Sequence, residues 1–81
     1  MWFLYIAKFA DNKLYTGIST DVKRRIAQHN KGIGAKSLKG KGPVTLLYSE
    51  VCESRTAALK REHEIKGWSR LKKLKLIHTK V

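Results

Sequence analysis

The sequence contains one cysteine and no long apolar run, and both shortages exclude whole classes of protein. Because Cys52 has no second cysteine to pair with, a disulfide framework is excluded and a reducing, cytoplasmic compartment is expected. Cys52 itself is expected to be a small buried or half-buried apolar residue. No apolar segment reaches the roughly 20 residues of a membrane-spanning helix. The apolar opening at residues 2–7 has no basic region before it, so a signal peptide is not expected either.

Acidic residues are scarce as well: six Asp and Glu stand against 18 Lys and Arg, which gives a formal net charge of +12. A surplus this large attracts phosphate groups at long range and binds them by counterion release. Since 42% of the residues are hydrophobic, the chain also has the material for a packed core. We expect one domain over residues 1–81 with a polyanionic partner, nucleic acid first and an anionic membrane surface as the weaker alternative.

Short apolar segments separated by polar turns predict three strands. Residues 2–17 indicate a β-hairpin that turns at Asp11-Asn12, and residues 44–51 predict the third strand. Tyr5 and Tyr15 face the same side of the sheet only if paired residue numbers have an even sum. We expect both tyrosines to face one side, and this requires a loop of odd length, or a bulge, next to Asp11-Asn12.

Capping residues and helical spacing predict three helices. One covers residues 22–30, with its N-cap among Ser19-Thr20-Asp21; a second covers residues 55–66, between Ser54 and Gly67; a third runs from residue 70 to about 78. Helical spacing assigns the following residues to inward faces: Val22, Arg25, Ile26 and His29 in the first helix, Ala58, Leu59, Glu62 and Ile65 in the second, and Leu71, Leu74 and Ile77 in the third. Residues 31–43, rich in glycine and lysine, predict a mobile basic loop.

Five polar residues fall where the predicted elements bring them toward one side of the small sheet: Tyr5, Tyr15, Arg25, His29 and Glu62. A carboxylate can hold a divalent cation that polarises a phosphate. An arginine can stabilise the charge that builds on phosphoryl oxygens, and a phenol or an imidazole can take a proton from an attacking water. These are the groups that phosphodiester hydrolysis needs.

The intervals between these residues resemble those of the GIY-YIG nuclease superfamily, and more closely those of its small stand-alone bacterial members, over residues 3–68. Phe3-Leu4-Tyr5 stands where the family has Gly-Ile-Tyr, and Tyr15-Thr16-Gly17 stands where it has Tyr-Ile-Gly. Arg25 lies ten positions after the second tyrosine, His29 lies four positions further, and Glu62 matches the family's late glutamate. The family's glycine and isoleucine are replaced here, but its tyrosines, arginine and glutamate are present.

The resemblance implies an α+β fold, in which a three-stranded antiparallel sheet is flanked by about three helices, and divalent-metal-dependent endonuclease activity on DNA, as in DNA repair. It implies that Tyr5 and Tyr15 line the site, one of them as general base or water-orienting group. Arg25 would clamp the phosphate, His29 would assist proton transfer or contact phosphate, and Glu62 would bind Mg²⁺ or Mn²⁺. We expect these residues to contact the nucleic acid: Gly17, Arg24, Lys31, Lys36, Lys39 and Lys41.

With 81 residues and no appended recognition domain, recognition of DNA structure is expected rather than of base sequence. The expected substrate is branched, nicked or single-stranded DNA, and RNA is a second candidate. An unidentified protein is a further candidate partner. The rival function is a non-catalytic module that binds DNA or structured RNA, and a weaker third is a structural protein of a ribonucleoprotein particle.

Each site residue also has a structural interpretation. The tyrosines would be half-buried strand aromatics with their hydroxyls at the rim, and His29 would cap a helix C-terminus. Arg25 and Glu62 would form an ion pair between two helices.

Overall fold

The computed structural model describes residues 1–31 and 43–79, which form three strands and three helices. In chain order the elements are β1 (Trp2–Lys8), β2 (Leu14–Ser19), α1 (Val22–Asn30), β3 (Thr45–Cys52), α2 (Arg55–Lys66) and α3 (Arg70–Thr79). The strands form one sheet in the order β2-β1-β3, and both pairings are antiparallel. The predicted α+β fold, with a three-stranded antiparallel sheet and three helices, is confirmed.

The turn between β1 and β2 is a three-residue loop, residues 10–12. The Phe9 N–H donates to the Lys13 carbonyl oxygen at 2.9 Å, and the Asn12 N–H donates to the Phe9 carbonyl oxygen at 3.0 Å. Asn12 has a φ of 70°, the left-handed conformation that closes such a loop and that asparagine tolerates better than most residues. A two-residue turn would have paired Ala10 with Lys13, so the predicted loop of odd length is confirmed.

The hairpin register places the two tyrosines on one face of the sheet. Tyr5 pairs with Gly17 and Ala7 pairs with Tyr15, so paired residue numbers sum to 22. Directly paired residues of antiparallel strands project to the same face, and residues two apart in one strand share a face. Tyr5 and Tyr15 therefore lie on the same side, as the parity argument requires.

Local capping fixes where α1 and α2 begin. The Asp21 carboxylate accepts the Arg24 N–H at 3.0 Å, and the Ser54 hydroxyl accepts the Ala57 N–H at 3.1 Å. Each bond satisfies one of the donors that a helix N-terminus leaves unpaired. Both helices have the bounds that the sequence predicts. Among the described residues, no helix combines the length and the apolar character needed to cross a membrane.

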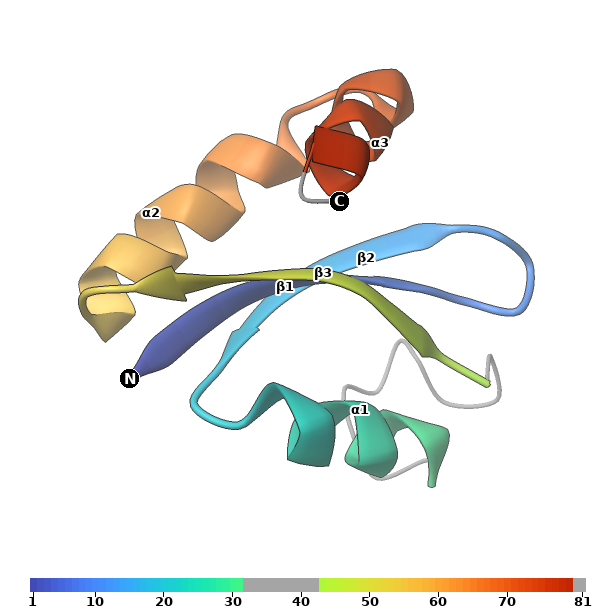
Figure 1. The fold of residues 1–81 in the computed structure, drawn as a ribbon, viewed down its shortest axis with the longest axis horizontal. Helices are drawn as coiled ribbons and strands as arrows, with labels where there is room; N and C mark the ends of the chain where they lie inside the picture. The colour runs from blue at the N-terminus through green and yellow to red at the C-terminus, as the bar shows by residue number, and fades with distance from the viewer. Residues whose placement is uncertain (32–42, 80–81) are drawn as a thin grey trace.

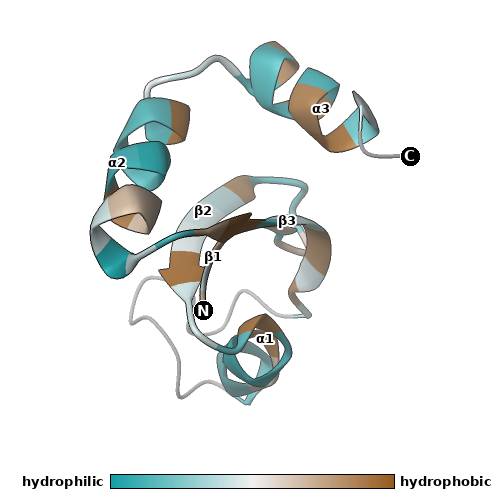
Figure 2. Cartoon of the chain, turned by 60° about the vertical axis from the view of Figure 1, so that its left-hand side comes forward, coloured by the Kyte–Doolittle hydropathy of each residue, from teal (hydrophilic) through white to brown (hydrophobic). Residues whose placement is uncertain are grey.

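The sheet lies between two helical layers, with α1 on one face and α2 and α3 on the other (Figure 1). Central strand β1 is buried on both faces, and the brown colour at the centre of the sheet in Figure 2 reflects its apolar sequence. The core on the α1 side consists of Tyr5, Ala7, Phe9, Val22 and Val44. The core on the α2 side consists of Leu4, Ile6, Cys52, Ala58 and Ile65. Cys52 is a buried free thiol, as expected.

A charged network fastens α2 to the edge strand β3. The Arg61 Nε donates to a Glu50 carboxylate oxygen at 3.0 Å, and the Tyr48 hydroxyl donates to the other oxygen at 2.6 Å. Arg61 also pairs with Glu64 on its own helix and lies over the Trp68 ring, 5.4 Å from its centroid. The α2 helix is therefore held to the sheet by directional polar contacts as well as by apolar packing.

Three predicted details of burial and strand position are wrong. Leu71 is 65% exposed because α3 packs on the α2-side core through Leu76 and Ile77, near its other end. Leu59 is 38% exposed because the buried stripe of α2 runs through its neighbour Ala58 instead. The third strand is shifted by one residue from the predicted 44–51, and its register on β1 contains an irregularity.

Candidate active site

Tyr5 and Gly17 form the centre of the candidate site. A Cβ atom on Gly17 would lie 2.8 Å from the Tyr5 hydroxyl and 2.9 Å from a Tyr15 ring carbon, so only glycine leaves room for the two rings. The Tyr5 and Tyr15 ring centroids are 6.2 Å apart. Tyr5 is 1% exposed, so the interpretation of its hydroxyl as a rim group is wrong. Gly17 is also buried, and its predicted contact with nucleic acid stays a prediction.

His29 joins this cluster from α1. Its Nε2 forms a 3.1 Å hydrogen bond with the Tyr5 hydroxyl, and its ring makes a T-shaped contact with the Tyr15 ring at a centroid distance of 5.8 Å. The residue is 2% exposed. Burial first, and then the positive charge of Arg25, lower the pKa of His29 below its ordinary value of 6.5. The imidazole is therefore neutral at pH 7.

Arg25 lies one turn before His29 on α1 and is half-buried. One guanidinium nitrogen donates to the Gln28 side-chain oxygen at 3.5 Å, at the long limit of a hydrogen bond. The guanidinium acts electrostatically on both Tyr5 and His29. It is thus a half-buried cation that interacts with the Tyr5 hydroxyl at the edge of the tyrosine cluster, where it could bind an incoming anion.

Glu62 approaches the cluster from the opposite layer. It lies on α2, which packs against β2 and β1, and its side chain is 19% exposed. Its carboxylate pairs with Lys66 on the same helix at 3.5 Å. Since Arg25 binds Gln28 on its own helix, the described residues do not support a structural Arg25–Glu62 ion pair.

The Tyr5 phenol experiences the charges of both of these residues. Burial raises the pKa of Tyr5 to about 12, Tyr15 and Glu62 add to the rise, and Arg25 opposes it. Side chains from β2, α1 and α2 therefore act on this one phenol group of β1.

A single carboxylate is a sparse but sufficient anchor for Mg²⁺ or Mn²⁺. In residues 1–31 and 43–79, no three His, Cys, Asp or Glu side chains are grouped so that they could hold a metal ion. Mg²⁺ keeps several waters and is commonly held by one or two carboxylates plus substrate phosphate oxygens. Glu62, whose side chain is 19% exposed, could supply one carboxylate to that kind of shared coordination.

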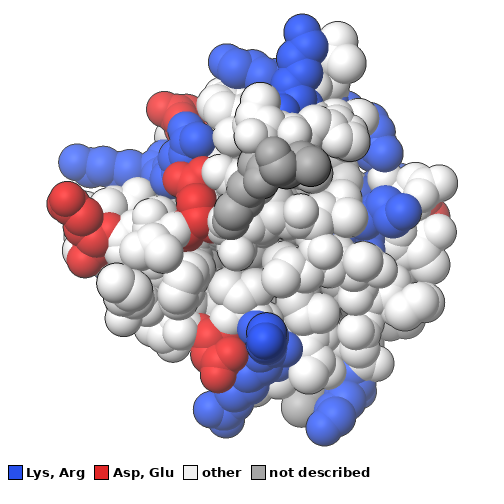
Figure 3. Space-filling view, in the orientation of Figure 1, with Lys and Arg blue, Asp and Glu red and all other residues white. Residues whose placement is uncertain are grey.

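The predicted nucleic-acid-binding lysines and arginine are only partly placed by the structure. Arg24 and Lys31 are exposed on α1 and just after its end. Lys36, Lys39 and Lys41 lie outside the described residues. Basic side chains stand out over α1 and over α3 in Figure 3, and are not confined to one of these layers.

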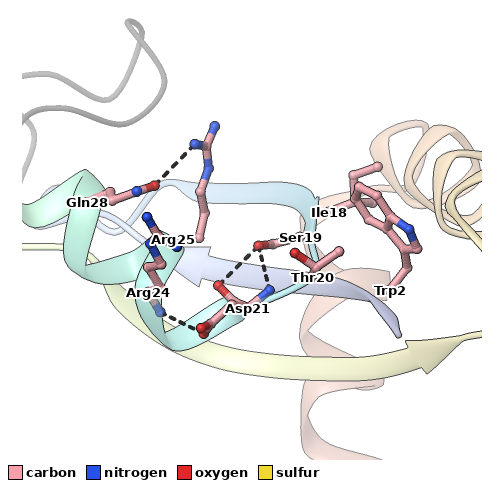
Figure 4. A pocket seen from close by; sticks show the side chains of 8 residues that line it. All are labelled: Trp2, Ile18, Ser19, Thr20, Asp21, Arg24, Arg25 and Gln28. Atoms are coloured by element: carbon pink, nitrogen blue, oxygen red, sulfur yellow. Dashed lines mark hydrogen bonds between the residues drawn. The ribbon is translucent and has the colours of Figure 1, made fainter.

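Beside Arg25 lies a pocket of about 290 Å³ that the sequence did not indicate (Figure 4). It is lined by Trp2, Ile18, Ser19, Thr20, Asp21, Arg24, Arg25 and Gln28. The pocket wraps around the end of β2, so its residues come from both faces of the sheet. The one sequence signal that could have suggested this pocket was the presence of an aromatic residue, Trp2, in a strongly basic chain. That signal did not indicate which residues would lie next to Trp2.

The structure is thus a small three-layered α+β domain. Two tyrosines pack over a glycine in its candidate site, and a histidine, an arginine and a glutamate act on them. The chain belongs to the GIY-YIG catalytic domain family, whose model matches residues 1–75. Membership supports a nuclease-like role and confirms the predicted resemblance.

Relatives of the chain are small proteins of similar length. Over 76 residues it is 51% identical to the "UPF0213 protein" of Cronobacter sakazakii, covering 94% of this chain and 80% of that protein. Over 76 residues it is 50% identical to the "UPF0213 protein YhbQ" of Escherichia coli K12, covering 94% of this chain and 76% of that protein. The solution NMR structure of the UPF0213 protein BH0048 from Bacillus halodurans is 41% identical and has a TM-score of 0.63, with 99% of this chain and 86% of that chain covered.

Proposed function

We propose that this domain is a cytoplasmic, Mg²⁺- or Mn²⁺-dependent endonuclease that hydrolyses DNA phosphodiester bonds and recognises DNA structure rather than base sequence. The observation that carries the proposal is the Tyr5 phenol, which hydrogen-bonds His29 at 3.1 Å and lies within the electrostatic reach of Arg25 and Glu62. An acid, a cation and a proton acceptor around one phenol form a set suited to hydrolysis of a phosphate diester. We take residues 1–81 as a single domain, which would recognise DNA by shape and charge.

Glu62 would hold the divalent cation, which would supply positive charge to the phosphate and the leaving oxygen. Arg25 would bind a non-bridging phosphate oxygen from the α1 side and stabilise the charge that develops there. These two groups come from opposite layers, so the scissile phosphate would lie across the β2 edge of the sheet, between α1 and α2.

Tyr5 and His29 would together remove the proton from the attacking water. The raised pKa of Tyr5 keeps the phenol protonated, and the lowered pKa of His29 keeps the imidazole neutral. In the tautomer whose Nδ1 carries hydrogen, the Tyr5 hydroxyl donates to His29 Nε2. The phenol can then pass its proton to Nε2 while its oxygen takes one from water, and Tyr15 orients the water or the substrate.

The test compares wild type with Glu62→Ala on labelled flapped, branched, nicked, single-stranded and double-stranded DNA, with Mg²⁺ or Mn²⁺. Wild type is expected to cut at least one substrate, and Glu62→Ala to be slower by about 100-fold or more, because the cation contributes several kcal/mol. Binding at low salt should change little. Glu64→Ala, an exposed carboxylate on the same helix, is the matched control and should cut normally.

The second candidate function is a non-catalytic module that binds DNA or structured RNA, and the net charge of +12 favours it. It predicts no cleavage by wild type with either cation, together with affinity that falls steeply as salt rises. Equal cleavage by wild type and Glu62→Ala would contradict the role proposed for this carboxylate.

A further inference from the structure

The pocket at the end of β2 has two chemically different ends. Trp2 and Ile18 form an apolar end on the α2 side of the sheet, and Arg25 and Gln28 lie at the other end, on α1 (Figure 4). Ser19 and Asp21, between them, hydrogen-bond each other through the Ser19 hydroxyl and the Asp21 main chain. These bonds engage the Ser19 hydroxyl and the Asp21 main chain, so we look to the two ends for what the pocket binds.

The cationic end carries more positive charge than the protein itself neutralises. Within residues 1–31 and 43–79, the Arg24 guanidinium has no hydrogen-bond or ion-pair partner, since its bond to Asp21 is made by its main chain. The Arg25 guanidinium has a long bond to Gln28 and also interacts with the Tyr5 hydroxyl. The carboxylate of Asp21 is engaged in capping α1. The Arg24 guanidinium is therefore available to an anion at this end, with the positive charge of Arg25 beside it.

A ligand that matches both ends has a flat apolar ring and a phosphate a few bonds away, which describes a nucleotide. Aromatic side chains bind the faces of nucleobases whatever the sequence, and guanidinium groups bind phosphate oxygens. The volume of about 290 Å³ is near the roughly 300 Å³ at which small-molecule pockets begin, so it suits one nucleotide and not several.

We propose that this pocket binds an unpaired nucleobase next to the cleaved phosphate, with the base against Trp2 and Ile18 and an adjacent phosphate on Arg24. The inference rests on the proposed function, because it assumes a nucleic-acid strand in the Arg25 position. A base within a duplex is stacked on both sides and paired, so it cannot enter without being extruded. The substrate class is thus DNA with at least one unpaired nucleotide beside the cut, as in a flap, gap or single strand.

The first measurement uses fluorescence from Trp2 alone. The chain has two tryptophans, and Trp68→Phe removes the other one, which lies against α2 and α3 and lines no part of the pocket. With EDTA present to prevent cleavage, this variant is titrated with single-stranded oligothymidylate of about 12 nucleotides, within the usual site size of single-strand binders. Trp2 emission should be quenched by the oligothymidylate and unchanged by an abasic strand with the same number of phosphates.

The second measurement compares affinities. Trp2→Ala should bind oligothymidylate roughly 5- to 100-fold more weakly than wild type does, which is the usual range for loss of one base–aromatic contact. It should bind the abasic strand as tightly as wild type does. Trp2→Phe, which keeps an aromatic ring, should retain most of the affinity. Wild type should bind the oligothymidylate more tightly than it binds a duplex of the same length. It should bind dTMP far more weakly than the oligothymidylate or the duplex, because dTMP lacks neighbouring phosphates.

The proposal is overturned if base-bearing and abasic strands quench Trp2 equally, or if Trp2→Ala weakens both to the same degree. Binding of dTMP as tight as that of the strand also overturns it, since the pocket would then serve free nucleotides. These outcomes are separable from failure of the nuclease proposal. If the protein cleaves DNA but Trp2 quenching does not depend on the base, only the base-pocket proposal fails. If the base quenches Trp2 but no DNA is cleaved, only the nuclease proposal fails.

Discussion

The Nε2 atom of His29 and the hydroxyl of Tyr5 lie 3.1 Å apart, inside the core that joins α1 to the central strand. Two polar side chains, separated by 24 positions in the chain, are thus buried together. Burying either group without a partner would cost free energy, so their hydrogen bond supports the fold as well as the proposed proton transfer. The candidate active site and the core share these atoms.

Protonation of His29 should destabilise the fold in acid. Its pKa is lowered in the folded state, so between that lowered value and 6.5 the unfolded chain binds more protons. Stability is therefore complete above pH 6.5 and decreases as pH falls through this window. We expect urea unfolding at a series of pH values to show this loss in wild type and a smaller loss in His29→Gln. The exposed His63→Gln variant should behave as wild type, and equal pH dependence in all three would contradict the prediction.

Gly17→Ala should damage both stability and cleavage. The added Cβ would lie 2.8 Å from the Tyr5 hydroxyl, and overpacking of this kind typically costs about 1–3 kcal/mol. Gly67→Ala is the matched control, because its Cβ would meet only a main-chain oxygen at 3.5 Å. Denaturant unfolding of the two variants and DNA cleavage should separate them. A Gly17→Ala protein as stable and active as the control would show that Tyr5 does not need its present position.

Loss of Arg61 should weaken the attachment of α2 to the sheet. Arg61→Ala leaves the partly buried Glu50 carboxylate without its cation, which we expect to cost about 1–3 kcal/mol. Lys60→Ala, an exposed residue on the same helix, should change stability by less than about 0.5 kcal/mol. Because α2 also carries Glu62, cleavage by Arg61→Ala should fall while DNA affinity is retained. Identical unfolding curves for the two variants would remove Arg61 from this role.

The basic loop that the sequence predicts over residues 31–43 lies mostly outside the described residues, and we expect it to contribute to nucleic-acid affinity without sequence preference. Changing Lys36, Lys39 and Lys41 together to Ala should weaken binding to all DNA sequences and reduce the slope of log affinity against log salt by about 3. A control variant with Lys60, Lys72 and Lys75 changed to Ala loses the same charge from α2 and α3. An unchanged slope in the loop variant would exclude these lysines from the contact surface.

Local signals in the sequence were enough to predict α1 and α2. Asp21 and Ser54 cap helices through bonds to residues only three positions away, so nothing distant is needed to place them. The shared face of Tyr5 and Tyr15 was predicted differently, because the expected site needs both rings on one side of the sheet and strand parity then requires a loop of odd length or a bulge.

What the sequence did not reveal depends on contacts between distant elements. The exposure of Leu71 follows from where α3 meets the core, and helical periodicity cannot locate that point. The pocket is a stronger case, because Trp2 and Arg24 approach each other only where the two faces of the sheet meet at the end of β2. Of the predicted site, the structure brings Tyr5, Tyr15, His29 and Arg25 together and adds the charge of Glu62.

The three-residue loop at residues 10–12 is a place where this protein can change in length. If one residue were added there and the strands kept their present partners, the partner of Tyr15 would still be Ala7, so both tyrosine rings would stay on the α1 side. Only a slip of the β1–β2 register by one residue would turn Tyr15 to the α2 side. Proteins that share this tyrosine pair should therefore tolerate loops of different length here, provided that the strand register is kept.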